Sequence, residues 1–309
     1  MAYLGIQTQI RNNNRNSILL LMLFPVLLLA MVYAILFFSG NDTAASTAAF
    51  MQSLPFVIIG ISIWFAIAYF ANSAMIRMAT GAQPLQRREN KRVYNLVENL
   101  SISQGMKMPH VCVIEDPSLN AYASGINEKT YTITLSRGII NTLDDAELES
   151  VIAHELAHIR NRDTRLLIIS IIFVGIFAFV SQVAFRSFLY RGLGRRSGKN
   201  NNGGVVLIVV IVVSAVAYFL SLLLKFGISR KREYMADAGA AEMTKDPAAL
   251  ASALRKIAAN PHIEAVKNED VAQLFIEHPK PKRKGSFSLN NLFATHPPIE
   301  DRIRILENF

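Results

Sequence analysis

The chain has 309 residues, of which 51% are hydrophobic and only 18% are charged, a balance that is unusual for a soluble globular protein. Its single cysteine, Cys112, excludes an intramolecular disulfide bond, so nothing in the composition indicates an oxidising compartment. The net charge of +9 would suit nucleic acid, but the basic residues lie beside apolar runs and are not interleaved with aromatic residues. This distribution predicts attraction to anionic lipid and no binding of nucleic acid.

Four uncharged apolar runs hold the excess of hydrophobic residues. They are residues 17–38, 54–71, 166–185 and 205–224. A helix of about 20 residues is roughly 30 Å long, which matches the hydrocarbon core of a bilayer. Apart from transmembrane helices, the runs could form buried core helices of a large soluble domain. The first run is too long for the apolar core of a cleaved signal peptide. We therefore expect transmembrane helices.

The charges beside the runs predict the orientation of the chain. Residues 1–16 are basic, whereas residues 39–53 contain one acid and no base. The positive-inside rule then places the first loop outside and everything after the second run in the cytoplasm. The last two runs leave two options open. Their lengths favour two full crossings, but the basic, acid-free loop 186–204 between them favours a hairpin that never emerges.

Residues 75–165 are mixed polar and predict a soluble domain. A helix is expected from about residue 88 to 104, and short strands at 110–116 and 129–138. Residues 117–127 between these strands are expected to form a turn and an edge strand.

A helix is predicted next over residues 144–163. Asp144 can cap it, with Glu147 as the capping-box partner three residues later. Apolar side chains recur at helical spacing and predict the face toward the core; they are Leu148, Val151, Ile152 and Leu156.

The same helix contains the sequence HELAH, with His154, Glu155 and His158. Residues four apart on a helix share a face, so the two histidines can hold one ion. Glu155 is then placed to take a proton from a water molecule that the ion activates, the arrangement of zincins. The competing interpretation is a surface helix with two ordinary histidines.

A catalytic zinc site needs a third protein ligand. A third histidine in the same segment is absent, because Asn161 and Thr164 stand three and six residues after His158. Past the fourth run, Glu233 and Asp237 share one helix face. Glu233 would complete a His₂Glu site and Asp237 could orient a ligand histidine, although such a pair alone is more often a solvated helix face.

The C-terminal part is predicted to contain two helices separated near Asp246 and Pro247. Residues 278–291, rich in proline, lysine and serine, are expected to form a mobile loop.

These motifs together resemble the HtpX-like membrane zinc metalloproteases, relatives of the CAAX prenyl proteases. The resemblance lies in "HELAHIRNRD", "SRKREYMADAGAA" and "THPPIEDRI", and it extends to "MPHVCVIEDPSLNAYASG" and "DDAELESVIAHE", so it covers nearly the whole chain. It implies that His154, His158 and Glu233 bind one Zn²⁺ and that Glu155 is the catalytic base.

The resemblance also implies further site residues. An edge strand that pairs with an extended peptide substrate would be formed by Asn120, Ala121, Tyr122 and Ala123. His296 and Arg302 lie in the segment that resembles the family's HPP motif, and both could face the cleft and share the oxyanion. Alternatively, Thr295 caps a terminal helix that Pro297 and Pro298 begin, and Arg302 pairs with a nearby acid.

The expected fold is a mainly α integral membrane protein whose transmembrane helices carry a cytoplasmic α+β protease domain of the zincin (gluzincin) type with a small β-sheet. The expected parts are a cytoplasmic segment 1–16, a transmembrane hairpin 17–74, protease parts 75–165 and 225–309, and a second hydrophobic hairpin 166–224.

The expected function is that of a membrane-anchored zinc endopeptidase. The resemblance implies cleavage of misfolded or damaged membrane proteins at the cytoplasmic face, in a bacterial plasma or inner membrane, with other quality-control proteases as possible partners. A dedicated processing protease shares every feature. A non-catalytic scaffold with structural zinc would not need Glu155, and a transporter would be expected to carry ionisable residues inside the spans, which all four runs lack.

Overall fold

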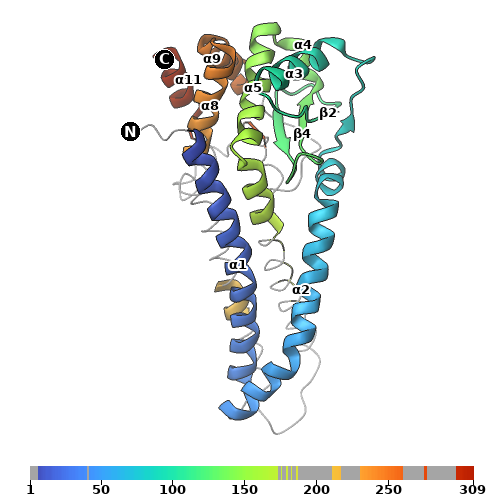
Figure 1. The fold of residues 1–309 in the computed structure, drawn as a ribbon, viewed down its shortest axis with the longest axis vertical. Helices are drawn as coiled ribbons and strands as arrows, with labels where there is room; N and C mark the ends of the chain where they lie inside the picture. The colour runs from blue at the N-terminus through green and yellow to red at the C-terminus, as the bar shows by residue number, and fades with distance from the viewer. Residues whose placement is uncertain are drawn as a thin grey trace. The chain divides into compact units, whose positions relative to one another are not determined.

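The structure is a computed structural model, and it describes residues 6–39, 42–172, 175, 179, 182, 186, 211–216, 230–259, 275–276 and 297–309. These residues form mainly helices together with one small mixed sheet, as expected (Figure 1). The chain divides into two compact units. One contains residues 1–15, 71–168 and 226–309, and the other contains residues 16–70 and 169–225.

Two long helices contain the first two apolar runs, α1 (Ile6–Ser39) and α2 (Thr43–Thr80). Among the described residues, one helical stretch, Thr43–Ile67, is long and apolar enough to cross a membrane, with a mean hydropathy of 1.9. Its most apolar part is not buried by other residues, whereas Met22–Ala34 in α1 is a shorter apolar stretch. Most of the predicted second hairpin, 166–224, lies outside the described residues.

The sheet has four strands, which confirms the predicted ones and adds a short fourth. They are β1 (Gln83–Pro84), β2 (His110–Ile114), β3 (Ala121–Ser124) and β4 (Thr132–Ser136). Their order is β1-β2-β4-β3, with β2 and β4 parallel and the other two pairs antiparallel. The predicted edge strand, β3, therefore lies at one edge of the sheet that the described residues form.

Two helices adjoin these strands in the sequence, one between β1 and β2 and one after β4. The first, α3 (Lys91–Ser103), begins slightly later than predicted because Asn90 caps it: the Asn90 side chain accepts a hydrogen bond of 3.0 Å from the backbone N–H of Val93. The second, α4 (Arg137–Thr142), follows β4 directly.

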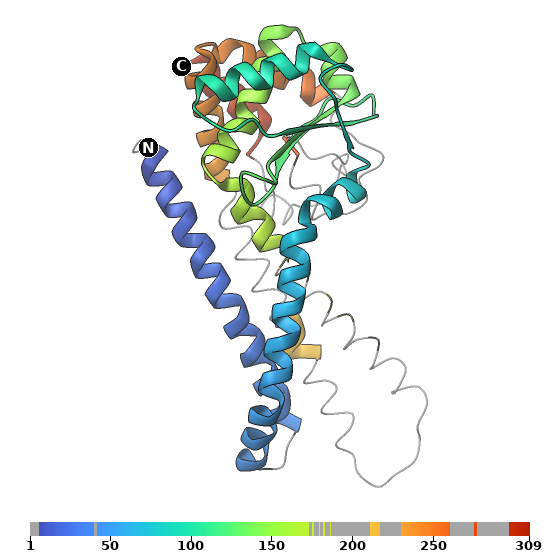
Figure 2. The same cartoon turned by 45° about the vertical axis from the view of Figure 1, so that its right-hand side comes forward.

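The helix with the HELAH motif, α5 (Asp145–Arg160), begins with the predicted capping box. Asp144 accepts a hydrogen bond of 2.9 Å from the backbone N–H of Glu147, and Glu147 accepts one of 3.1 Å from that of Asp144. The four predicted core residues of this helix are fully buried. The helix packs against β3 on one side and against the C-terminal helices on the other (Figures 1 and 2).

The C-terminal helices are α8 (Arg230–Thr244), α9 (Pro247–Ala259) and α11 (Ile299–Glu307). The break between α8 and α9 confirms the predicted boundary. Close packing of α8 on α5 depends on Gly239, because a Cβ added there would lie 3.0 Å from the Cβ of Ala157.

The alternative prediction for the last helix was wrong about its start. Pro297 and Pro298 precede α11, because the N–H groups of Asp301 and Arg302 donate to the Pro298 carbonyl, which makes Pro298 the N-cap. Thr295, His296 and the predicted loop 278–291 lie outside the described residues.

Candidate metal centre

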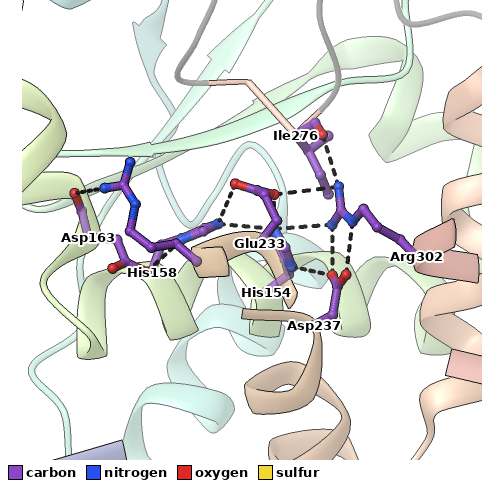
Figure 3. Close-up of polar contacts among 8 residues, drawn as sticks. His154, His158, Asp163, Glu233, Asp237, Ile276 and Arg302 are labelled. Atoms are coloured by element: carbon purple, nitrogen blue, oxygen red, sulfur yellow. Dashed lines mark hydrogen bonds and ion pairs between the residues drawn. The ribbon is translucent and has the colours of Figure 1, made fainter. Parts of the chain in front are cut away.

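Two helices bring three potential ligands to one point (Figure 3). His154 and His158 are one turn apart on α5, and their Nε2 atoms are 3.1 Å apart. Glu233 on α8 reaches both: Oε2 is 3.6 Å from Nε2 of His154, and Oε1 is 3.6 Å from Nε2 of His158. One ligand atom from each residue lies within 4.8 Å of the others.

The ligand set is almost completely removed from solvent. The side chain of His154 is 0% exposed, that of Glu233 is 8% exposed and that of His158 is 13% exposed. Three polar side chains so deeply buried require partners, because burying a polar group without one is costly.

A carboxylate contacts the second ring nitrogen of each histidine. Oδ1 of Asp237 is 2.9 Å from Nδ1 of His154, and Oδ2 of Asp163 is 3.0 Å from Nδ1 of His158. Nδ1–H of His158 can therefore donate to Asp163, and Oδ1 of Asp237 lies in ion-pair contact with Nδ1 of His154. In both histidines the Nε2 atom is left facing Glu233 and the other histidine.

Each of these carboxylates has an arginine beside it. Arg302, on α11, is fully buried and donates to Oδ2 of Asp237 from Nε at 2.8 Å and to Oδ1 from Nη2 at 2.7 Å. Arg232, on α8, donates from Nη1 to the backbone carbonyl of Asp163 at 3.2 Å. Burial opposes ionisation of Asp237, but the charge and hydrogen bonds of Arg302, together with His154, lower the pKa of Asp237 to about 2.

The arrangement fits a zinc ion. Two atoms bound to a tetrahedral ion at about 2.05 Å lie about 3.3 Å apart. The two Nε2 atoms are separated by 3.1 Å, close to that value, and each carboxylate oxygen of Glu233 lies 3.6 Å from one of them. The electrostatics agree. Burial lowers the pKa of His154, yet Asp237 and Glu233 outweigh this effect and raise it to about 9, so the site favours positive charge.

Glu155 follows His154 on α5 and is 2% exposed. Burial raises the pKa of its carboxyl group, and both histidines, together with a contact to the backbone of Ala123, lower it in part. This contact joins the predicted base to strand β3.

The predicted substrate-binding edge lies against the chain's own backbone. Residues Asn120, Ala121, Tyr122 and Ala123 are buried, and the Ala121 carbonyl accepts a hydrogen bond of 2.9 Å from the N–H of Ile276. The rings of Tyr122 and Phe275 meet edge to face with centroids 4.7 Å apart, and these two residues form an antiparallel bridge.

Three neighbours of the site were not predicted from the sequence: Asp163, Arg232 and Ile276. Asp163 follows a turn in which Arg162 has a φ of 60°, so helical spacing could not place it opposite His158. The only indication in the sequence of a contact between Asp163 and His158 was that this acid follows the predicted ligand by five positions. His296, the second predicted oxyanion donor, lies outside the described residues.

Comparison with known proteins places the chain in a family. The profile of peptidase family M48 matches residues 87–309. A protein described as "Protease HtpX homolog" from Bacteroides fragilis (strain YCH46) is 58% identical over an alignment of 322 positions, which covers 100% of both chains. A second one from Tropheryma whipplei (strain Twist) is 35% identical over 257 aligned residues, which cover 83% of this chain and 86% of that protein.

The solved structure entitled "Crystal Structure of S. mikatae Ste24p" aligns with 90% of this chain, with a TM-score of 0.45 and 18% sequence identity. This chain spans 61% of the length of that one. The family profile covers more than half of the present sequence, and the Bacteroides relative matches it from end to end. The predicted family resemblance is thereby confirmed, and the chain belongs to peptidase family M48.

Proposed function

We propose that the chain is a membrane-anchored, zinc-dependent endopeptidase that cleaves polypeptides at the cytoplasmic face of the membrane. The observation that carries this proposal is the convergence of His154, His158 and Glu233 beside the buried carboxyl group of Glu155. Membership of a peptidase family supports hydrolysis of peptide bonds as the reaction.

The chemistry is divided between the ion and the chain. A zinc ion held by His154, His158 and Glu233 would act as a Lewis acid and lower the pKa of water. Glu155 takes a proton from the attacking water and delivers it to the leaving amine, as a general base and then a general acid. Asp163 and Asp237 hold the rings of His158 and His154 in the orientation that presents Nε2.

The proposed substrate is an extended polypeptide lying along β3. What supports this is the hydrogen bond between Ile276 and Ala121, because it demonstrates that a backbone N–H can reach the carbonyl at this edge. The contact between Glu155 and Ala123 puts the base next to the same strand. A substrate strand would take over the hydrogen bond that Ile276 now makes.

Anchoring in a bilayer is supported by the exposed apolar surface of α2. Both Phe56 and Trp64 lie in the apolar stretch Thr43–Ile67, and their side chains are exposed to 76% and 40%, respectively. Large exposed apolar surfaces are rare on soluble monomers but natural against lipid. Together with the charges beside the apolar runs, this surface supports membrane proteins as substrates, and hence a role in their quality control.

The test combines zinc analysis with proteolysis by the purified full chain in detergent. The substrate is denatured bacteriorhodopsin, an unfolded membrane protein. We expect about one zinc per chain, loss of cleavage when a chelator removes the metal, and recovery when Zn²⁺ is returned. Undiminished cleavage by protein without zinc would overturn the proposal. Bound zinc without cleavage of any unfolded protein would support the scaffold instead.

A further inference from the structure

Arg302 is the largest fully buried side chain among the residues that the structure describes, and it carries a charge. A buried guanidinium is tolerated only where partners compensate for its lost hydration. Its short hydrogen bonds run from Nε and Nη2 to Asp237, and from Nη1 to the Ile276 carbonyl at 3.2 Å. The sequence is compatible with two roles for this residue, an oxyanion donor or a structural ion pair with an acid.

The contacts connect Arg302 to a metal ligand through one intermediate carboxylate. Oδ1 of Asp237 accepts from Nη2 of Arg302 at 2.7 Å and lies 2.9 Å from Nδ1 of His154. Because two parallel hydrogen bonds hold the plane of the carboxylate, the direction of Oδ1 toward His154 is fixed as well. Figure 3 shows this sequence of contacts, from Arg302 through Asp237 to His154.

The distances from Arg302 to the ligands themselves are longer. Nη2 is 3.5 Å from Nε2 of His154, and Nη1 is 3.5 Å from Oε2 of Glu233. Strong hydrogen bonds of this type are about 2.7–2.9 Å long. The strongest interactions of the guanidinium are therefore with Asp237.

We propose that Arg302 is a positioning residue, which holds Asp237 so that Asp237 in turn fixes the ring of His154, and that α11 thereby completes the metal centre. This inference rests on the proposed function, since it assumes that His154 binds zinc. The charge of Arg302 also balances that of Asp237, so the pair adds no net charge beside the ligands.

The test measures metal binding directly in the full chain, with three variants. Arg302→Gln removes both the charge and the pair of parallel hydrogen bonds that the guanidinium makes to Asp237. Arg302→Lys keeps the charge but cannot make both bonds in parallel, and Arg304→Gln is the control. Arg304 is on the same helix but exposed, and it pairs with Asp301. The readouts are zinc affinity by competition with a chromogenic chelator, the visible spectrum of the Co²⁺-substituted protein, and the thermal unfolding midpoint.

We expect Arg302→Gln to weaken zinc binding about 10–100-fold, the range for a group that orients a ligand from outside the coordination sphere. Its Co²⁺ spectrum should change, because the ring of His154 is no longer fixed. Arg302→Lys should recover part of the affinity, and Arg304→Gln should match the wild type. Wild-type affinity and spectrum in Arg302→Gln, with kcat reduced about 10²–10³-fold, would assign an oxyanion donor and overturn the proposal. A lower unfolding midpoint with an unchanged spectrum would also overturn it.

Loss of one partner of a buried ion pair can prevent folding, so a double-mutant cycle provides the second test. Its corners are the wild type, Asp237→Asn, Arg302→Gln and the double variant, whose two amides can hydrogen-bond without charge. If the pair acts as a unit, the double variant loses no more zinc affinity than the worse single variant. A double variant in which the two losses add, or in which folding is restored but zinc affinity is normal, would contradict the proposal. Failure of the wild type to bind zinc or Co²⁺ would instead refute the proposed function.

Discussion

The acidic residues of the site differ in role because they face different atoms of the histidines. Glu233 approaches the Nε2 atoms of His154 and His158, where an ion would bind, whereas Asp163 and Asp237 contact the Nδ1 atoms. A carboxylate at Nδ1 fixes the ring and raises its basicity, and one at Nε2 can itself bind the metal. Substitution of Glu233 is therefore expected to affect metal binding differently from substitution of Asp163 or Asp237, although all three residues are acidic.

Asp163→Ala should weaken zinc binding about 10–100-fold, because Nδ1 of His158 loses its acceptor and the ring can rotate. Asp237→Ala should have an effect of the same size on His154, whereas Glu233→Ala removes a ligand and should be more severe. Chelator competition measures all three, with Glu300→Gln as an exposed acidic control. Wild-type zinc affinity in Asp163→Ala would show that the contact between Asp163 and His158 does not contribute to zinc binding.

The predictability of these residues depends on whether one helix relates them. His154, Glu155 and His158 lie within five consecutive residues, so helical geometry alone predicts that they are neighbours. Glu233 lies 75 positions after His158, so helical spacing could only offer it as a candidate ligand, and the resemblance to a family then indicated that it would meet the histidines. Arg302 could be named, but whether it faced an acid or a substrate required the tertiary structure.

At the scale of elements, α5 positions both histidines and the proposed base, Glu155, so its start and its packing should control the site. Glu147 stabilises the start of α5 through two sets of hydrogen bonds. Besides its role in the capping box, its side chain accepts hydrogen bonds from Ser252 at 2.7 Å and from Lys256 at 2.6 Å, both on α9. Although burial raises the pKa of Glu147, these partners outweigh burial and hold it below its ordinary value.

Glu147→Gln should lower the free energy of unfolding by about 1–2 kcal/mol at pH 7, because it removes charge-assisted hydrogen bonds. The folded-state pKa of Glu147 lies below the unfolded value. Its stabilising contribution is therefore complete above the unfolded pKa of about 4.3 and disappears as the pH falls through the folded pKa. Unfolding midpoints of both proteins should differ at pH 7 and converge under acidic conditions. A difference that persisted at low pH would contradict this assignment.

Gly239→Leu should separate α8 from α5 and disturb the site from a distance. The added side chain would meet Ala157 and the guanidinium of Arg160. We expect a loss of about 1–3 kcal/mol from overpacking, together with weaker zinc binding, because Glu233 and Asp237 move with α8. Ala238→Leu is the control, since Ala238 lines an open hollow with Lys245 and Phe309. Unaltered zinc affinity in Gly239→Leu would show that the distance between the helices does not govern the ligands.

Local signals predicted most elements, because caps and periodicity are encoded by adjacent residues. The start of α5 at Asp144 and the break before Pro247 are examples. The start of α11 was predicted wrongly because a proline can be the first residue of a helix or precede it, and the hydrogen bonds to the Pro298 carbonyl determine which. The pairing of Ile276 with Ala121 joins residues 155 positions apart, and no local pattern contains it.

At the level of the whole molecule, we predict that the membrane separates the α1–α2 loop from the protease residues. In a Cys112→Ser background, Ala45→Cys near the start of α2 should react with an impermeant maleimide in intact spheroplasts. Ser103→Cys, exposed at the end of α3, should react only after permeabilisation. Labelling of Ser103→Cys in intact spheroplasts would place the proposed catalytic residues outside.

Ser197→Cys in the same Cys112→Ser background tests the second hairpin, and labelling from outside would favour two full crossings.

The membrane character of the chain was predictable from composition, because spanning a bilayer requires long uncharged runs. The sequence also indicated three strands of the sheet, but not the order β1-β2-β4-β3, because the parallel pairing of β2 with β4 depends on contacts across the whole sheet. That order leaves β3 beside α5, where an extended backbone lies next to Glu155.

The proposal that Glu155 is the base of a zinc peptidase is tested most directly by measuring zinc content and proteolysis in the same preparation of Glu155→Gln. The substitution keeps the size of the side chain but removes its ability to accept a proton, and it leaves His154, His158 and Glu233 unchanged. We expect about one zinc per chain, as in the wild type, with cleavage of denatured bacteriorhodopsin reduced by at least about 10²-fold. Near-normal cleavage by the zinc-loaded variant would contradict the role of Glu155 and, with it, the proposed mechanism.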